Sequence, residues 1–302
     1  MISFLNSSLQ AAAPIVLVAV GGVFAHRAGI LHLGLEGLMI IGAFVATAVT
    51  IKSGSIWLGL GAAIAVDLVV SALFWLLVVV LRANVFIAGL GLSIAGLGIT
   101  AFLLEVIFKT EGAIQTRHGL PRPISGPHGG VLGLATDLSV IDWATPVLVV
   151  LAWVVLRRSR LGLRVAAAGE YPFAARSAGV DVARIRLAAV AVTGFFCALG
   201  GADLALASVR SFSEDMTQGR GYLAFTAILF GAEHPLGAAA AALFFGLAEA
   251  LGIQSQLGLT KAIPIQFVLM VPYLITIVAI ATSSAWRKRL GLVAGTFAEL
   301  RD

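Results

Sequence analysis

Long apolar stretches separated by short polar ones run along most of the 302-residue chain. Several approach the roughly 20 apolar residues that a helix needs to cross a bilayer. A membrane β-barrel would instead show alternating segments of about 10 residues. The pattern predicts an all-α, polytopic transmembrane helical bundle that forms a single domain over residues 1–302. The apolar stretches lie near residues 9–25, 33–51, 56–81, 85–108, 143–156, 187–208, 221–232, 235–253 and 262–283.

The stretch 221–232 is too short to cross a membrane alone. It is separated from the next stretch by "GAEHP", in which Pro235 interrupts a helix and two polar side chains, Glu233 and His234, are costly in lipid. We therefore expect a re-entrant half-helix followed by a returning helix, and about eight full spans.

Two segments share a pattern of small residues, "GLEGLMIIGAFVA" at 34–46 and "GYLAFTAILFGAEHPLGAAAAALFFG" at 221–246. In the expected topology they start on opposite sides of the membrane. The likeness suggests an inverted repeat with a pathway near the bilayer midplane.

Composition supports a membrane protein, with 60% hydrophobic residues, 12% charged residues and a mean hydropathy of +1.03. The sequence pI near 9.9 needs no nucleic-acid partner, because excess Lys and Arg usually mark cytoplasmic loops of membrane proteins. The first basic residue, Arg27, follows the first apolar stretch, so we expect a retained first helix. Counting the spans outward from the basic loops leaves the N-terminus outside. Basic residues concentrate at 157–186 and 286–289, which predicts a cytoplasmic loop at 158–186.

The segment 109–142 is long and rich in Gly and Pro, and the topology makes it an external loop. Loops of this length are usually functional or structureless. A partner-docking or lid loop and a plain connection therefore remain open alternatives.

Several kinds of chemistry are missing from the sequence. It has no GxxxxGK[ST] phosphate-binding loop, no HExxH or GxSxG motif and no Cys/His spacing for a metal. Its one cysteine, Cys197, permits no intrachain disulfide. We expect neither an enzyme nor a chain that binds a cofactor, a metal or ATP by itself.

Ionisable residues inside spans usually face protein or water. Asp67 is the deepest, and it is a candidate proton or cation site or, as the favoured alternative, a buried hydrogen-bond partner of a neighbouring helix. The other acids lie nearer to helix ends, where water or headgroups are within reach: Glu36, Glu105, Asp203 and Glu249.

The segment "LRANVFIAGLGLSIAGLGITAF" at 81–102 has small residues four apart, which favours close helix packing. The pairs are Gly89 with Ser93, Gly91 with Ala95, and Gly96 with Thr100. A polar amide and an aromatic ring at the entrance of this helix, Asn84 and Phe86, are candidates for contact with a polar, ring-shaped substrate.

The segment "AAAGEYPFAARSAGVDVARIR" at 166–186 is unusually charged for this chain. Pro172 suits the first turn of a helix, Glu170 complements its positive end and Gly179 suits its end. A short helix over 171–178 results, with small alanines and flanking arginines. A basic loop that only sets orientation is the alternative, but it leaves the capped helix unexplained, so we favour a docking element.

Through these segments the chain resembles the permease subunits of bacterial ATP-binding-cassette importers for branched-chain amino acids, simple sugars and nucleosides, and most closely the nucleoside and simple-sugar permeases. The segments that carry the resemblance are "AGILHLGLEGLMIIGAFVA" (28–46), "LRANVFIAGLGL" (81–92), "RSRLGLRVAAAGEYPFAARSAGVDVARIR" (158–186) and "GRGYLAFTAILFGAEHPLGAAAAALFFGLAEA" (219–250).

The resemblance implies a multi-pass protein of the bacterial inner membrane, surrounded by lipid, in which segment 170–179 is the coupling helix. Its partners would be ATPase subunits that bind ATP-Mg, a second permease that is identical or paralogous, and an external solute-binding lipoprotein. The coupling candidates are Glu170, Tyr171, Pro172, Ala174, Ala175, Arg176 and Gly179, and the pathway candidates are Asn84, Phe86, Ser93 and Glu36. Four positions depart from the family pattern and leave the substrate open: His32, Leu38, Val85 and Glu233.

The leading hypothesis is a permease subunit that imports a nucleoside, a nucleobase-like compound or a simple sugar by alternating access. One alternative is a proton-coupled secondary transporter that uses Asp67. The other is a structural membrane protein, which gives no purpose to the intramembrane acids or the re-entrant segment.

Overall fold

The computed structural model describes residues 2–110, 112–124 and 136–258. The chain divides into two compact units, residues 1–247 and 248–302. The second unit is described only as far as residue 258, where it is helical. The prediction of a single domain therefore stays a prediction, and the arrangement below is that of the first unit.

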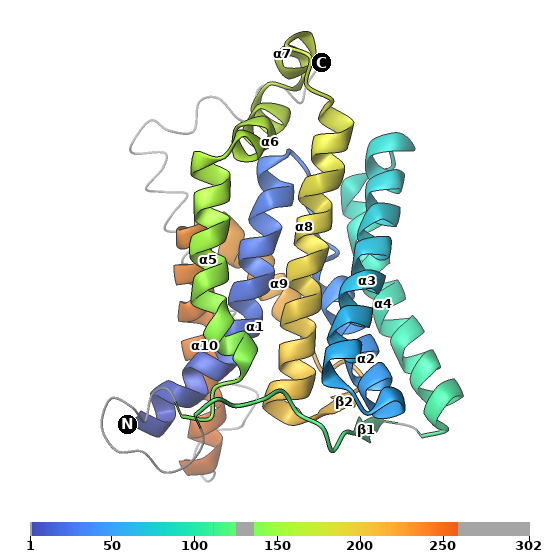
Figure 1. The fold of residues 1–302 in the computed structure, drawn as a ribbon, viewed down its shortest axis with the longest axis vertical. Helices are drawn as coiled ribbons and strands as arrows, with labels where there is room; N and C mark the ends of the chain where they lie inside the picture. Colours follow the sequence, from blue (N-terminus) through green and yellow to red (C-terminus); the bar gives the residue numbers. More distant parts are fainter. Residues whose placement is uncertain (1, 111, 125–135, 259–302) are drawn as a thin grey trace. The chain divides into compact units, whose positions relative to one another are not determined.

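The described residues are mainly helical, which confirms the all-α polytopic fold class (Figure 1). The α-helices are α1 (Ile2–Arg27), α2 (Leu35–Ser53), α3 (Ile56–Trp75), α4 (Val85–Phe108), α5 (Val140–Arg158), α6 (Arg160–Glu170), α7 (Pro172–Ser177), α8 (Val182–Asp203), α9 (Arg220–Phe230) and α10 (Pro235–Gly258). Short π-helical turns, η1 (Leu76–Val80) and η3 (Leu204–Val209), extend α3 and α8, and two three-residue strands are β1 (Ala113–Gln115) and β2 (Ser211–Ser213).

Short polar residues cap the N-termini of several helices. The side chain of Ser55 accepts a hydrogen bond from the backbone N–H of Leu58 at the start of α3, and Ser159 and Asp181 do the same for α6 and α8. Ser139 and Asp142 form a capping box at α5. Such caps satisfy N–H groups that no helical carbonyl reaches, so the helix starts follow from local sequence.

Six helical segments in the described part of the chain are long and apolar enough to cross a membrane: 6–27, 35–53, 56–80, 85–108, 140–158 and 182–207. The apolar helices at 220–230 and 235–250 are shorter. The ninth apolar stretch, 262–283, lies outside the described residues, so the number of about eight spans stays a prediction.

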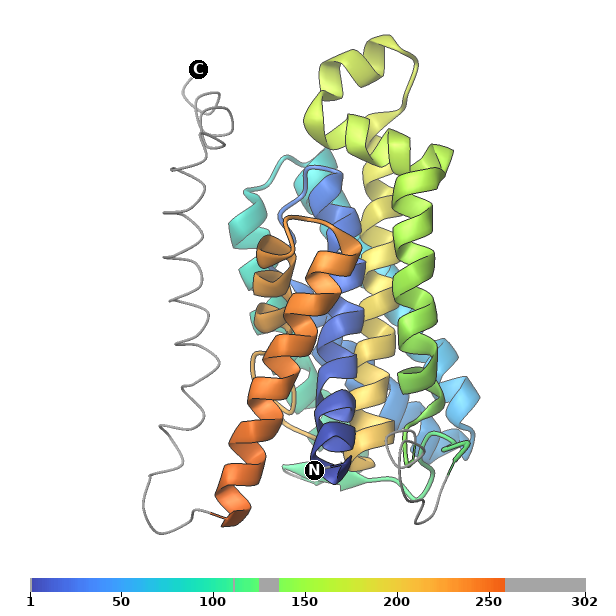
Figure 2. The same cartoon turned by 90° about the vertical axis from the view of Figure 1, so that its left-hand side faces the viewer.

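The core of the unit forms around α1 and α2. Helix α1 packs against α5, α8 and α9, and α2 packs against α3, α4 and α8 (Figures 1 and 2). Protein buries 83% of the most apolar 18-residue stretch of α1 and 72% of that of α2. The corresponding shares are 22% in α3 and 28% in α4. The outer helices therefore leave most of their apolar surface uncovered by the rest of the unit.

One end of the bundle carries α6 and α7, and the other carries β1 and β2; we call them the α7 end and the strand end (Figure 1). Strands β1 and β2 pair antiparallel, with Ala113 opposite Ser213 and Gln115 opposite Ser211. The pairing ties the segment predicted as an external loop, 109–142, to the residues that follow α8. Helix α5 begins at Val140, inside that segment, because its capping box starts it three residues before the apolar stretch.

The segment 158–186 holds more helix than the sequence analysis expected. Besides α7, it contains α6 and the first turn of α8. Helix α6 was not predicted, because the charge of this region masks the spacing of Gly162, Val165 and Ala168, which α6 buries. Glu170 is therefore the last residue of α6, although it still lies just ahead of α7.

A short helix, a turn and a following helix are present where the re-entrant segment was expected, and its re-entry into the membrane stays a prediction. Helix α9 has 11 residues, the turn 231–234 follows it, and α10 begins at Pro235 (Figure 2). Two non-glycine residues in the turn, Ala232 and Glu233, have positive φ angles of 51° and 56°. Glu233 lies 3.8 Å, Oε1 to Nδ1, from His26 in the last turn of α1.

Candidate translocation junction

Two helices begin inside the bundle, and a single carboxylate joins their N-termini. Glu36, in the first turn of α2, accepts hydrogen bonds from the backbone N–H of Gly219 (3.0 Å to Oε1) and of Gly221 (2.6 Å to Oε2) at the start of α9. Its side chain is only 1% exposed. A negative charge stabilises a helix N-terminus, and charge-assisted hydrogen bonds of this kind are the stronger ones.

Glycine makes this contact possible. A Cβ on Gly221 would lie 2.5 Å from both Cα and N of Glu36, and Gly219 has a φ of +82° that L side chains rarely adopt. The first turn of α9 therefore lies directly on the first turn of α2.

From this point the two helices run to opposite ends of the bundle. Helix α2 ends at the strand end, where Thr50 contacts Gly59 near the start of α3. Helix α9 ends at the α7 end, where the following turn reaches His26 of α1. The expectation that the two segments start on opposite sides of the membrane is therefore wrong, because both begin at this junction. An inverted repeat of the two halves stays a prediction.

Helix α4 forms one wall of the junction. A Cβ on Gly96 would lie 2.9 Å from Cα of Gly37, and Gly37 in turn lies against the carbonyl oxygen of Leu92. The hydroxyl of Ser93 donates to the carbonyl oxygen of Leu33, at 3.3 Å, in the connection before α2. Two of the four pathway candidates, Glu36 and Ser93, are thus brought together.

The connection between α1 and α2 holds a buried histidine whose environment the sequence analysis did not foresee. The ring of His32 stacks on Phe74, with centroids 3.9 Å apart, and its Nδ1 accepts a hydrogen bond from the backbone N–H of Gly34. Burial, and to a lesser extent the charge of His26, lowers the pKa of His32 from 6.5 to about 3. The ring is therefore neutral at physiological pH.

Asp67 is buried between three helices. Oδ2 would lie 2.9 Å from a Cβ on Gly42 of α2, and one turn along α3 Ser71 contacts Gly194 of α8. Neither carboxylate oxygen of Asp67 has a hydrogen-bond partner among the described residues. The favoured expectation of a hydrogen bond to a neighbouring helix is therefore not met in this part of the chain.

The remaining pathway candidates, Asn84 and Phe86, lie at the start of α4. Asn84 caps its own helix: its Oδ1 accepts hydrogen bonds from the backbone N–H of Phe86 (2.9 Å) and Ile87 (3.3 Å). Phe86 is 49% exposed. Their contact with a substrate stays a prediction.

The expectation that acids near helix ends reach water is wrong for Glu36 and Asp203, which are 1% and 0% exposed. Asp203 instead accepts a hydrogen bond of 2.8 Å from the hydroxyl of Ser139 in the α5 capping box. The end of an apolar stretch does not coincide with the surface of the bundle at these two places. The glycines that flank Glu36 were the available signal of close packing.

The coupling candidates cluster around α7. Pro172 lies in its first turn, Gly179 has a φ of +81°, and Phe173 and Tyr171 are strongly exposed. Ala174 is also exposed and Arg176 lies over the ring of Phe173. Ala175 is different, because it packs inward against Ala168 and Val182. Adjacent residues of a helix face different directions, so Ala175 supports α7 and does not contribute to a smooth exposed face.

Titratable groups do not gather into a metal site in the described part of the chain, where no three His, Cys, Asp or Glu residues lie together suitably. The thiol of Cys197 is buried in α8, within electrostatic range of Asp67 and Glu36. The candidate site is therefore a junction of helix ends and buried acids.

Almost the whole chain is similar to known proteins. Residues 4–280 match the family described as "Branched-chain amino acid transport system / permease component". The guanosine ABC transporter permease protein NupQ of Bacillus subtilis is 36% identical over 91% of this chain and 89% of its own length. The nucleoside ABC transporter permease protein NupC of Lactococcus lactis is 33% identical, over 89% of this chain and 88% of its own.

The putative glucose ABC transporter permease protein TsgC13 of Haloferax volcanii is also 36% identical, over 83% of this chain and 77% of its own length. No solved structure matches the chain.

Proposed function

The chain belongs to the branched-chain amino acid transport system permease family, and from this premise we propose that it imports a small polar solute as the permease subunit of an ATP-binding-cassette importer in a bacterial inner membrane. The observation that carries the proposal is the family match over residues 4–280. The solute is a nucleoside, a nucleobase-like compound or a simple sugar, because similar permeases are named for guanosine, nucleosides and glucose.

The junction of α2, α4 and α9 supports a pathway at mid-depth. Discontinuous helices that meet inside a bundle are typical of the places where transporters bind and pass solutes. Glu36 keeps the two helix starts together, so a rearrangement that admits solute either moves α2 and α9 as one body or breaks these two hydrogen bonds. In alternating access, this junction opens to one side of the membrane at a time.

Energy for this movement comes from separate ATPase subunits that dock on α7. The exposed rings of Tyr171 and Phe173 supply the apolar contact, and aromatic side chains commonly carry much of the binding energy of an interface. Ala175 and the turn at Gly179 hold the helix in place. A second permease and an external solute-binding lipoprotein complete the assembly.

Co-purification from the source cells tests the docking. A tagged chain is expected to retain the ATPase, and Phe173→Ala to lower the retained amount about tenfold or more, as for other aromatic residues central to an interface. Leu163→Ala is the matched control, because Leu163 is an apolar residue of similar exposure, 73% against 81% for Phe173, on α6 and outside the coupling segment. Equal retention by all three chains would contradict docking on α7.

A second candidate function is proton-coupled transport, and the observation that favours it is the buried carboxyl of Asp67 without a hydrogen-bond partner among the described residues. Uptake into membrane vesicles separates the two functions. Import driven by ATPase subunits is expected to stop with vanadate and to persist with an uncoupler. Uptake that collapses with the uncoupler and ignores vanadate would exclude the first proposal.

A further inference from the structure

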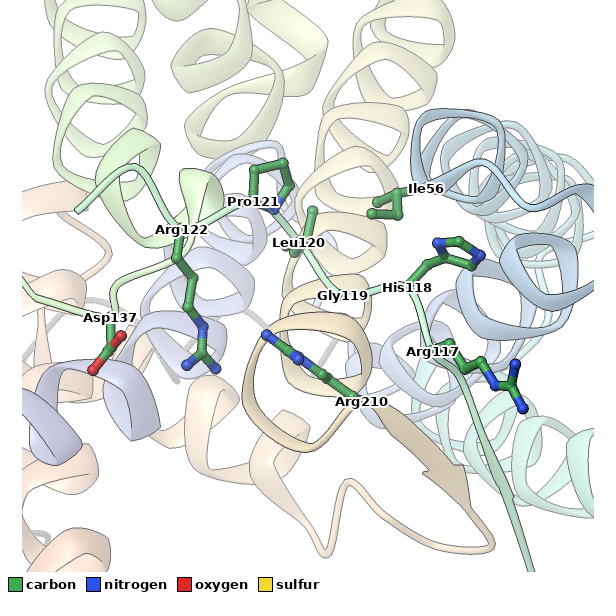
Figure 3. Close-up of a pocket in the computed structure, with 9 residues that line it drawn as sticks. All are labelled: Ile56, Arg117, His118, Gly119, Leu120, Pro121, Arg122, Asp137 and Arg210. Carbon is green, nitrogen blue, oxygen red and sulfur yellow. The ribbon is translucent and has the colours of Figure 1, made fainter. Parts of the chain in front are cut away.

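A pocket of about 490 Å³ opens at the strand end of the bundle, the end opposite α7 (Figures 1 and 3). Its walls come from the segment after β1 and from the residue that follows η3. The residues that line it are Ile56, Arg117, His118, Gly119, Leu120, Pro121, Arg122, Asp137 and Arg210. Neither the transport pathway nor the docking of the ATPase uses these residues.

Positive charge dominates the pocket. Three arginines line it against one aspartate, and Asp142 of α5 lies within electrostatic range of Arg122, so one positive charge stays in excess when His118 is neutral. In Figure 3 the guanidinium ends of Arg122 and Arg210 extend toward each other, whereas that of Arg117 points away from them. Two guanidinium groups that face one another repel each other unless an anion lies between them.

Both facing arginines are held in place by backbone. Arg122 donates a hydrogen bond of 2.9 Å from Nη2 to the carbonyl oxygen of Ala207. The side chain of Arg210 lies on Gly119, where a Cβ would come within 2.5 Å of Nε. The two walls are joined by hydrogen bonds from the N–H of Thr116 to the carbonyl of Arg210 and from the N–H of Leu120 to that of Leu206. The charges are therefore preorganised.

The pocket lies at the level where the spans end. Ile56 is the first residue of the α3 span, and Ala207, which anchors Arg122, is the last residue of the α8 span. Arg210 follows three residues later. This is the depth of the headgroups of a bilayer, where lipid phosphates lie next to the protein.

From this geometry we propose that the pocket, which we call the arginine pocket, binds a phosphate group between Arg122 and Arg210. The phosphate is either the diester of an anionic lipid headgroup or a phosphate in solution. Guanidinium groups bind phosphate oxygens through paired, charge-assisted hydrogen bonds, and the volume exceeds what one free phosphate fills, leaving room for a headgroup against Ile56 and Pro121. The proposal does not depend on the transported solute.

The test uses the full chain in nanodiscs and measures retained lipid by native mass spectrometry and stability by the thermal midpoint. One arm compares phosphatidylcholine alone with phosphatidylcholine plus phosphatidylglycerol. A second arm titrates inorganic phosphate into the phosphatidylcholine nanodiscs. We expect preferential retention of phosphatidylglycerol or a rise in midpoint with phosphate, and which arm responds identifies the source of the group.

Arg210→Gln is expected to weaken the response about tenfold, the loss that accompanies one charge-assisted hydrogen bond. Lys109→Gln is the matched control, since Lys109 is an exposed cation at the same end of the bundle that does not line the pocket. The proposal is overturned if neither arm responds in the unsubstituted chain, or if the two substitutions weaken the response equally.

Discussion

Helices α2 and α4 pack against each other, and both are long and apolar enough to span a membrane, yet their surroundings differ. Protein buries 72% of the apolar window of α2 and 28% of that of α4. Helix α2 carries the buried Glu36, Thr47 and Thr50, all with protein neighbours. Hydropathy therefore identifies a span but does not say whether its surroundings are protein or lipid.

The same contrast exists between the two faces of α4. Gly89, Ser93, Gly96, Thr100 and Leu104 form its buried stripe. Cβ atoms added at Gly91 or Gly98 would meet no heavy atom within 4 Å, at least among the described residues. Gly89 and Ser93 contact the connection before α2 and Gly96 contacts Gly37 of α2, whereas the pair at 91 and 95 is exposed. Spacing by four alone could not distinguish them.

The largest expected effect tests this contrast directly. Gly96→Leu forces a side chain into the backbone of Gly37, and we expect it to cost about 3 kcal/mol or more of stability, because two backbones cannot separate without moving whole helices. Gly98→Leu adds the same atoms on the open face and is expected to leave the thermal midpoint unchanged. Similar midpoints for the two variants would mean that α2 and α4 do not pack as described.

A smaller effect is expected at the buried end of α2. Glu36→Gln keeps the shape but removes the charge and leaves one carbonyl oxygen for two N–H donors, so we expect a loss of about 1.5–3 kcal/mol and impaired uptake. Glu105→Gln makes the same change on the exposed surface of α4 and serves as the control. If Glu36→Gln has the stability and uptake of the unsubstituted chain, the charge of Glu36 is not needed to hold the starts of α2 and α9 together.

At the exposed start of α4 the effect is smaller still. Asn84→Ala removes an N-cap and is expected to cost about 1 kcal/mol. Asn84→Asp keeps an oxygen that accepts the same hydrogen bonds and is expected to restore stability. If Asn84→Asp restores stability but not uptake, the amide also contacts solute; if it restores both, its role is the cap.

The smallest effect is expected on the face of α3 that meets α2. Asp67→Asn removes the ionisable group without changing its volume, and we expect uptake within about twofold of the unsubstituted chain, with stability equal or higher, because no described residue pairs with the carboxylate. The rate of solute uptake is measured in membrane vesicles that carry each variant. Loss of uptake would instead favour proton-coupled transport through Asp67.

Much of the fold was predictable because span length and hydropathy follow from the chain itself. The stretches near 9–25, 33–51, 56–81 and 85–108 correspond to α1–α4, and the half-helix at 221–232 corresponds to α9. The missed elements have other causes. Helix α6 buries only three small or apolar residues in a segment that stood out by its charge, and β1 and β2 exist only because distant segments meet.

The candidate site was less predictable, because its contacts join residues far apart in sequence. Glu36 was among the pathway candidates, but its partners Gly219 and Gly221 lie more than 180 positions away. The arginine pocket likewise needs Arg122 and Arg210 from different segments, and the sequence analysis had singled out neither. The coupling segment was easier to predict because Pro172 and Gly179 act on their own helix.

The burial of Cys197 has a practical consequence for chemical labelling. It is the only cysteine in the chain and is shielded from water inside α8, and a buried thiol of this kind reacts poorly with maleimides. A cysteine introduced at Phe173 or at Thr110, both in exposed positions, would therefore be the only reactive thiol. A membrane-impermeant maleimide added to intact cells would then report which of the two bundle ends faces the medium, without prior removal of the natural cysteine.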